Sequence, residues 1–168
     1  MTLAVGEDQA VPSLKRRLAC LIYDALLALG IVMATGLSYG LITQQRHALV
    51  GSRGLQLLVF IALGLYFVGF WVRQGQTLAM RTWHIRLVGA GGQSLSTARA
   101  VARYLLCWMW VLPALLAAHI AGLSTGWPVF AALLTGVLVY AGLSQLNRSK
   151  QYWHDIVCGT RLVDTRLL

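Results

Sequence analysis

The chain has 168 residues, of which 58% are hydrophobic and 11% charged, with a formal net charge of +9. Average globular chains carry about 25% charged residues, so a soluble domain this short could not bury so much apolar surface. The composition excludes an ordinary soluble domain and indicates a membrane-embedded bundle. Because the basic residues lie beside apolar runs, membrane topology and anionic lipid explain them, and nucleic acid is not an expected partner.

The first apolar run follows a short polar segment, 1–14, which is predicted to be a flexible tail. Three basic residues, 15–17, come next, and the run itself is predicted to span the membrane over 18–42. A helix needs roughly 20 apolar residues to cross the hydrocarbon layer. One carboxylate, Asp24, interrupts this run and makes it the most informative stretch of the chain.

Three further apolar runs predict three further spans, at about 55–72, 100–123 and 127–143. Pro113 is expected to kink the third span, because proline removes a helical hydrogen bond. The predicted fold is therefore all-α, with four transmembrane helices in one domain over 15–164 and a short C-terminal end, 165–168.

The polar loop after the second span has its own expected structure. Residues 77–82 are predicted to form a short helix along the membrane, and 83–88 alternate like a strand. The stretch from Gln76 to Val88 is echoed by the stretch from Gln151 to Val163, 75 residues later. The two strand-like ends are expected to pair as a small two-stranded sheet. A duplication and a chance echo both remain open.

The distribution of Lys and Arg predicts the orientation. Twelve of them lie beside the N-terminal flank, the middle loop and the tail, whereas Arg46 and Arg53 lie on the other side. By the positive-inside rule, both termini and the long loop are expected to be cytoplasmic. The expected location is the bacterial cytoplasmic membrane.

Asp24 is the main candidate for a functional group. An Asp near a helix centre costs about 2.5–3.5 kcal/mol of insertion free energy, and ionisable groups in a membrane commonly mark a functional site. Arg17 is seven residues away, about 10 Å along a helix axis, so it is not expected to touch Asp24. Arg103 is the expected partner. The pair would either serve as a cation or proton relay or only hold the helices together.

A second candidate is the run Trp153-His154-Asp155 near the C-terminus. His154 titrates near physiological pH, and a neighbouring carboxylate shifts its pKa. No Ser or Cys lies in an activating arrangement, so no catalytic residue and no enzyme activity are predicted. The three cysteines, Cys20, Cys107 and Cys158, have no metal-ligand spacing, and neither a metal nor a cofactor is expected.

Together these motifs resemble the RDD family of bacterial membrane proteins, which is named for one Arg and two Asp. The motifs are Arg17-Leu18-Ala19 with Asp24, Gly75-Gln76-Thr77-Leu78, and Trp153-His154-Asp155 with Gly159-Thr160. The matching family positions are Arg17, Asp24 and Asp155. One departure is that Ala79-Met80 stands where the family usually has Gly then Lys.

The resemblance implies an inner-membrane protein that is suspected of transporting a ligand, and some members are linked to sodium/proton exchange. We therefore expect a charged cluster of Arg17, Asp24, Arg103 and Asp155. Gln76, Trp153 and His154 are candidates for a cytoplasmic gate. The expected function is movement of a small solute or exchange of cations for protons, in a homo-oligomer. The alternative is a structural or accessory protein that binds lipid or a partner protein.

Overall fold

The structure is a computed structural model that describes residues 11–44, 52–123, 126–147 and 149–167. Residues 1–10 of the predicted tail lie outside this range, as do Arg46 and the centre of the first connection.

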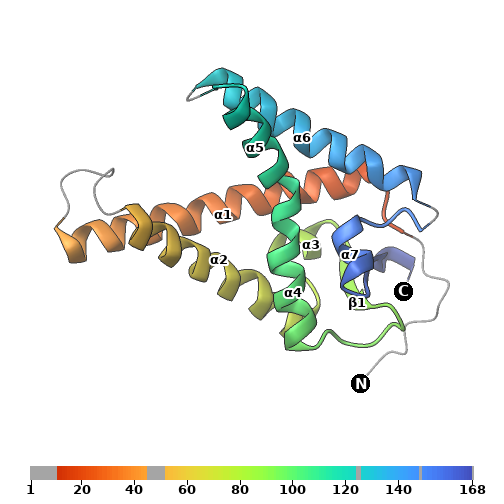
Figure 1. The fold of residues 1–168 in the computed structure, drawn as a ribbon. Helices are drawn as coiled ribbons and strands as arrows, with labels where there is room; N and C mark the ends of the chain where they lie inside the picture. The colour runs from red at the N-terminus through yellow and green to blue at the C-terminus, as the bar shows by residue number, and fades with distance from the viewer. Residues whose placement is uncertain (1–10, 45–51, 124–125, 148, 168) are drawn as a thin grey trace.

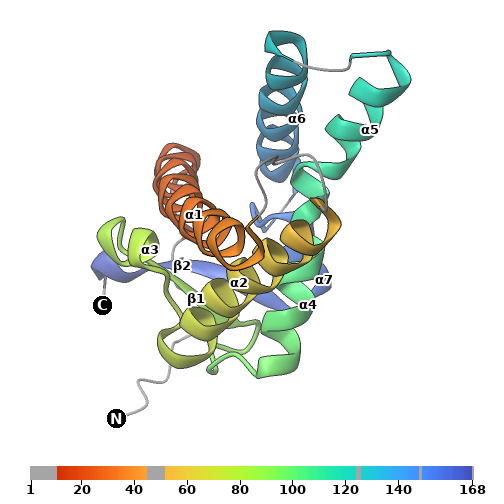
Figure 2. The same ribbon diagram turned by 90° about the vertical axis from the view of Figure 1, so that its left-hand side faces the viewer.

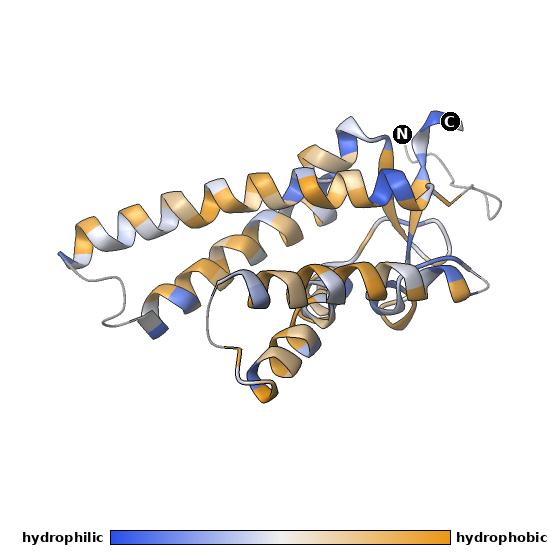
Figure 3. Ribbon diagram, turned by 90° about the horizontal axis from the view of Figure 1, so that it is seen from above, coloured by the Kyte–Doolittle hydropathy of each residue, from blue (hydrophilic) through white to orange (hydrophobic). Residues whose placement is uncertain are grey.

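Four helical segments are long and apolar enough to cross a membrane, by length and composition. They are Leu14–Thr43, Arg53–Gln74, Thr97–Ile120 and Trp127–Leu146, whose apolar colouring is visible in Figure 3. Large apolar side chains along these helices face outward; the exposed fraction of Leu41, for example, is 73%. Water would penalise such a surface, whereas a bilayer matches it. The chain is a multi-pass membrane protein, and the four predicted spans are confirmed.

The spans form two helical hairpins. Helix α1 (Leu14–Thr43) packs against α2 (Ser52–Gln74), and α5 (Leu112–Ile120) packs against α6 (Trp127–Leu146). Helix α4 (Thr97–Cys107) lies against α2 and carries the chain from the first hairpin to the second. Figures 1 and 2 show that the α5–α6 hairpin points away from the α1–α2 hairpin.

The third span is broken near its middle, as predicted from Pro113. Helix α4 ends at Cys107, a 3-10 turn follows over Trp108–Trp110, and α5 begins at Leu112 with Pro113 in its first turn. Proline is tolerated there because the first helical N–H groups have no intrahelical acceptor. The break lets α5 leave the direction of α4, which opens the angle between the hairpins.

Both hairpins end in a polar unit that we call the cap. It consists of α3 (Leu78–Thr82), β1 (Ile85–Gly89), α7 (Trp153–Val157) and β2 (Thr160–Asp164). The two strands pair antiparallel, from Ile85 opposite Asp164 to Gly89 opposite Thr160. The predicted short helix and two-stranded sheet are both confirmed. Ile85 and Leu87 of β1 and Leu162 of β2 are buried on one face of the sheet as part of the hydrophobic core, and Val163 is buried on the other face.

The two halves of the cap repeat in structure as well as in sequence. Both helices and both strands recur with the same lengths at an offset of 75 residues. His84 and Gly159, also 75 apart, both have a positive φ, of 55° and 60°. The amide of Ala90 donates to the Gly159 carbonyl at 2.8 Å, and the amide of Thr165 donates to the His84 carbonyl at 2.9 Å. The echo therefore corresponds to two equivalent helix–strand units.

In each half of the cap, a glutamine side chain hydrogen-bonds to the backbone of the strand. Nε2 of Gln76 donates to the Ile85 carbonyl at 2.8 Å. Nε2 of Gln151 donates to the Leu162 carbonyl at 3.0 Å, while its Oε1 accepts from the Leu162 amide at 3.0 Å. Gln151 thus satisfies both backbone groups of one buried strand residue, much as a neighbouring strand would.

Replacing Gln151 by Ala is expected to lower the free energy of unfolding by about 2 kcal/mol, because two buried backbone groups lose their partners. Denaturant titration in detergent, followed by circular dichroism, measures this change. The control is Gln145→Ala, at an exposed position of α6, which should stay within about 0.5 kcal/mol of the wild type. Equal stability of the two variants would contradict the role assigned to Gln151.

An ion pair fastens the start of α1 to the cap. The guanidinium of Arg16 donates to the Asp164 carboxylate at the end of β2 and to the carbonyl of Trp83. Burial alone would raise the pKa of Asp164, but hydrogen bonds from Arg166 and Arg16 outweigh it and lower that pKa to about 2. The carboxylate therefore stays charged at neutral pH, and the first span has a defined position relative to the cap.

Candidate functional site

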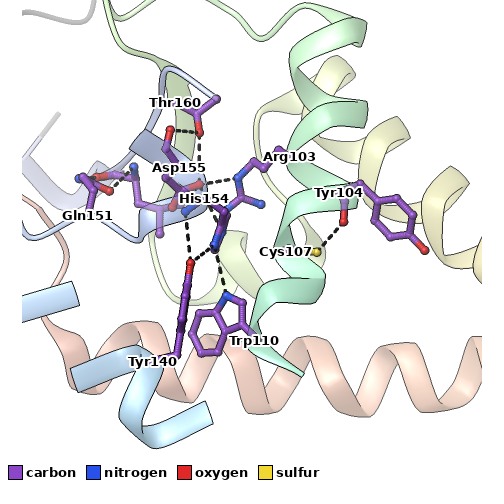
Figure 4. Close-up of polar contacts among 10 residues, drawn as sticks. Arg103, Tyr104, Cys107, Trp110, Tyr140, Gln151, His154, Asp155 and Thr160 are labelled. Carbon is purple, nitrogen blue, oxygen red and sulfur yellow. Dashed lines mark hydrogen bonds and ion pairs between the residues drawn. The ribbon is translucent and has the colours of Figure 1, made fainter. Parts of the chain in front are cut away.

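The strongest polar contact in the site joins α4 to α7. Nε of Arg103 donates to Oδ1 of Asp155 at 2.7 Å, and the Thr160 hydroxyl donates to the same oxygen at 3.2 Å (Figure 4). The guanidinium of Arg103 also lies 4.3 Å from the centre of the Trp71 ring, a cation–π contact. Asp155 is completely buried and Arg103 nearly so. This geometry makes the pair a rigid link between a membrane span and the cap.

His154 lies beside this pair in a ring of aromatic side chains. Its Nδ1 is 2.9 Å from the Tyr140 hydroxyl and 3.4 Å from Nε1 of Trp110 (Figure 4). An indole N–H only donates, so Nδ1 accepts and the remaining ring proton belongs on Nε2, which is 3.5 Å from the Asp155 carboxylate. Burial lowers the pKa of His154 to about 4, although Asp155 acts in the opposite direction. The imidazole is therefore neutral at physiological pH.

Asp24 is held differently from the prediction. Its Oδ2 accepts a hydrogen bond from the Thr77 hydroxyl at 2.9 Å, and the Cys20 thiol lies 3.9 Å away. Its Oδ1 is buried and has no hydrogen-bond partner among the described residues. The expected ion pair with Arg103 was wrong, because Arg103 is instead hydrogen-bonded to Asp155. The hydrogen-bond partners of Asp24 are neutral, although the charge of Arg103, which lines the same cavity, also acts on it.

Arg17 occupies the cap end of the same helix. The exposed fraction of Arg17 is 3%, and its Nη1 donates to the Lys150 carbonyl at 2.9 Å. Its guanidinium lies 4.6 Å from the centre of the Tyr152 ring. Its Nε is buried with no hydrogen-bond partner in the described part of the chain. No contact joins Arg17 to Asp24 within these residues, in agreement with their spacing on the helix.

Arg17, Asp24 and Arg103 line one cavity of about 320 Å³. His154 and Tyr152 contribute to the same wall, whereas Asp155 lies behind Arg103 and is not part of the lining. Most of the remaining surface is apolar and comes from α1, α2, α4 and the 3-10 turn. The structure thus gathers three of the four predicted cluster residues around a single space and places the fourth directly behind it.

The predicted gate residues do not come together. Gln76 binds the backbone of β1, His154 is buried among Trp110 and Tyr140, and the exposed fraction of Trp153 is 51%. These residue types are equally compatible with structural roles, and each contact here is a structural one. These contacts do not test a gating role, so the gate of Gln76, Trp153 and His154 stays a prediction.

Sequence reasoning missed several residues of the site. Thr77 is the main one, because its hydroxyl both caps α3, by accepting from the Met80 amide at 3.1 Å, and donates to Asp24. Tyr152, which stacks on Arg17, occupies the equivalent position 75 residues later. Both follow the repeated glutamine, so the internal echo was the signal that could have identified them.

Comparison with known proteins agrees with the motifs. The sequence model of the RDD family matches residues 11–159, which is most of the chain. No curated protein and no solved structure matches this chain.

Proposed function

Because this chain belongs to the RDD family, we propose that it moves a small solute or cation across its membrane, with Asp24 as the carboxylate that exchanges protons. The proposal makes the protein a transporter and not an enzyme. One observation carries it: Asp24 lies in a membrane span, on the wall of a cavity, with only neutral hydrogen-bond partners.

The chemistry of Asp24 supports this role. A carboxylate that accepts from an arginine is held in its charged form, whereas one that accepts only from a hydroxyl and a thiol is held in that form less strongly. The unpartnered Oδ1 leaves one oxygen available for a proton or a cation. Asp155 also has one oxygen without a partner among the described residues, but its other oxygen accepts from the Arg103 guanidinium, which favours the charged form. Of the two carboxylates, Asp24 is therefore the one suited to exchange.

We assign the protein to the bacterial cytoplasmic membrane, with both termini and the cap on the cytoplasmic side. The support is the asymmetry of basic residues, twelve of which lie beside the cap-side ends of the spans in the sequence. With this orientation, Arg17 lies at the cytoplasmic interface and Asp24 about 10 Å deeper. A homodimer would complete the walls of a path that four helices enclose only in part.

The rival function is structural or accessory, and the Arg103–Asp155 link favours it. A buried ion pair between α4 and α7 is what a protein needs to hold a cap on a bundle. Under this alternative, Asp24 and Thr77 would likewise serve only to hold α3 against α1.

Purified protein in vesicles with an internal pH dye distinguishes the two functions. A sodium or potassium gradient is expected to drive proton movement in the wild type and not in Asp24→Asn, whose amide can still accept from Thr77. Asp8→Asn, which removes a carboxylate outside the predicted spans, is the matched control and should retain the flux. Equal flux in the wild type and Asp24→Asn would remove Asp24 from the mechanism.

A further inference from the structure

Arg17 is a buried cation without a counterion. Its side chain is 97% removed from solvent within the chain, yet no carboxylate lies within ion-pair distance of it among the described residues. Its hydrogen bond to the Lys150 carbonyl and its contact with Tyr152 use one nitrogen and one face. Because Arg103 is paired with Asp155, the charge of Arg17 is left without compensation whenever Asp24 is neutral, and a bound anion would then balance it.

Other donors point to the same space. Arg103 lines the cavity with Arg17, and its Nε is the only one of its nitrogens that bonds to a described residue. The guanidinium groups of Arg17 and Arg103 therefore line one space with N–H groups that bond to no described residue, which suits a ligand head that carries several acceptor oxygens.

The rest of the cavity is apolar and elongated. Its lining follows α1 from Arg17 to Ala28, about 16 Å along the helix axis, and includes Leu21, Phe67 and Val137. A free inorganic anion would leave these walls without a partner. A single hydrocarbon chain attached to the anion would cover them, because apolar surfaces prefer apolar neighbours.

We propose that this cavity is a binding site for an anionic amphiphile, a single hydrocarbon chain with a phosphate or carboxylate head. The head binds Arg17 and the free nitrogens of Arg103, and the chain runs along α1 towards Ala28. The site goes beyond the proposed transport function, since the ligand need not be the solute that is moved.

Asp24 sets the charge of this site. Arg17 and Arg103 carry two positive charges, and Asp155 balances one of them. A charged Asp24 brings the four groups to neutrality, whereas a neutral Asp24 leaves one positive charge that an anion can balance. Removing the Asp24 charge therefore favours the amphiphile, although the same change is expected to abolish proton exchange.

Tryptophan fluorescence provides the assay, because Trp71, Trp108 and Trp110 line the cavity. The protein in neutral maltoside micelles is titrated with a brominated dodecyl phosphate, whose bromine quenches nearby indoles. Saturable quenching is expected with the phosphate head. The same chain with a trimethylammonium head should bind at least about tenfold more weakly, since it loses charge-assisted hydrogen bonds. Equal binding of both heads would overturn the proposal.

Two pairs of variants locate the ligand. Arg17→Gln should weaken binding by about tenfold or more, whereas Lys15→Gln, an equal loss of charge at an exposed position of α1, should not. Arg17→Lys keeps the charge, guards against loss of folding and should bind better than Arg17→Gln. Ala28→Phe should block the chain, whereas Leu29→Phe, at a residue whose exposed fraction is 56%, should not. Equal affinity within either pair would overturn the assignment.

The remaining experiments distinguish an amphiphile from free phosphate as the ligand, and distinguish this binding site from the proposed transport function. Displacement of the probe by inorganic phosphate at similar concentrations would show a phosphate site and overturn the amphiphile. Asp24→Asn is expected to bind the probe several-fold more tightly, and weaker binding would contradict the charge balance. Binding in micelles needs no transport, so a wild type that binds the probe but shows no cation-driven proton flux would overturn only the proposed function.

Discussion

Replacing Arg103 by Ala is expected to lower the free energy of unfolding by about 3–5 kcal/mol, because it leaves the Asp155 carboxylate buried without a counterion. Asp155 is fully buried, and its Oδ2 already lacks a partner among the described residues. The Thr160 hydroxyl would remain as a neutral donor to Oδ1, which cannot replace a guanidinium 2.7 Å away. Denaturant unfolding in detergent measures the loss.

Two further variants make this result specific to the pair. Arg99→Ala removes an exposed arginine one helical turn earlier on α4 and should change stability by no more than about 0.5 kcal/mol. The double variant Arg103→Met with Asp155→Asn removes both charges and should recover part of the loss. If Arg103→Ala were no less stable than Arg99→Ala, the pair would not hold α7 to the bundle.

The contribution of His154 to the stability of the protein is expected to fall as the pH decreases from about 6.5 to about 4. Burial lowers the pKa of His154 to about 4, whereas in the unfolded chain the pKa is near its ordinary 6.5. Between these values the unfolded chain binds more protons than the folded one, so acid favours unfolding. The difference corresponds to roughly 3 kcal/mol, fully present above pH 6.5 and lost towards pH 4.

Unfolding in detergent at a series of pH values tests this dependence. His154→Asn keeps a polar group facing Tyr140 and Trp110 but cannot take up a proton in this range, so it should gain stability relative to the wild type as the pH falls from 6.5 to 4.5. His84→Asn is the control, because His84 lies in the cap, away from the aromatic side chains that surround His154. A wild type and a His154→Asn variant with parallel pH profiles would contradict the assignment.

The structure gives different surroundings to Asp24 and Asp155, the two carboxylates of the family motif, which the sequence alone does not distinguish. Asp155 is bound by Arg103 and stabilises the fold, whereas Asp24 has only neutral hydrogen-bond partners and lines the cavity. Substitution of either residue would impair the protein, but for different physical reasons. Measurements of stability and of flux on the same variants are therefore needed to assign their roles.

The sequence by itself determined the four spans, the break near Pro113 and the two strands of the cap. Each of these depends on local properties: the length of an apolar run, the missing N–H of proline, and the alternation of a short segment. The positions of Arg17 and Asp24 on one face of α1 followed for the same reason, since helix geometry alone sets their spacing.

Only the tertiary structure decided which charged groups pair. Arg103 and Asp155 are 52 residues apart, and Thr77 and Asp24 are 53 apart. By charge alone, Arg103 could pair with either Asp24 or Asp155. It pairs with Asp155 because the pairing of β1 with β2 brings α7 against α4. The cavity, and the buried guanidinium of Arg17 within it, arise from the same packing of distant segments. No local pattern encodes these contacts, because their energies exist only once the two hairpins and the cap have come together.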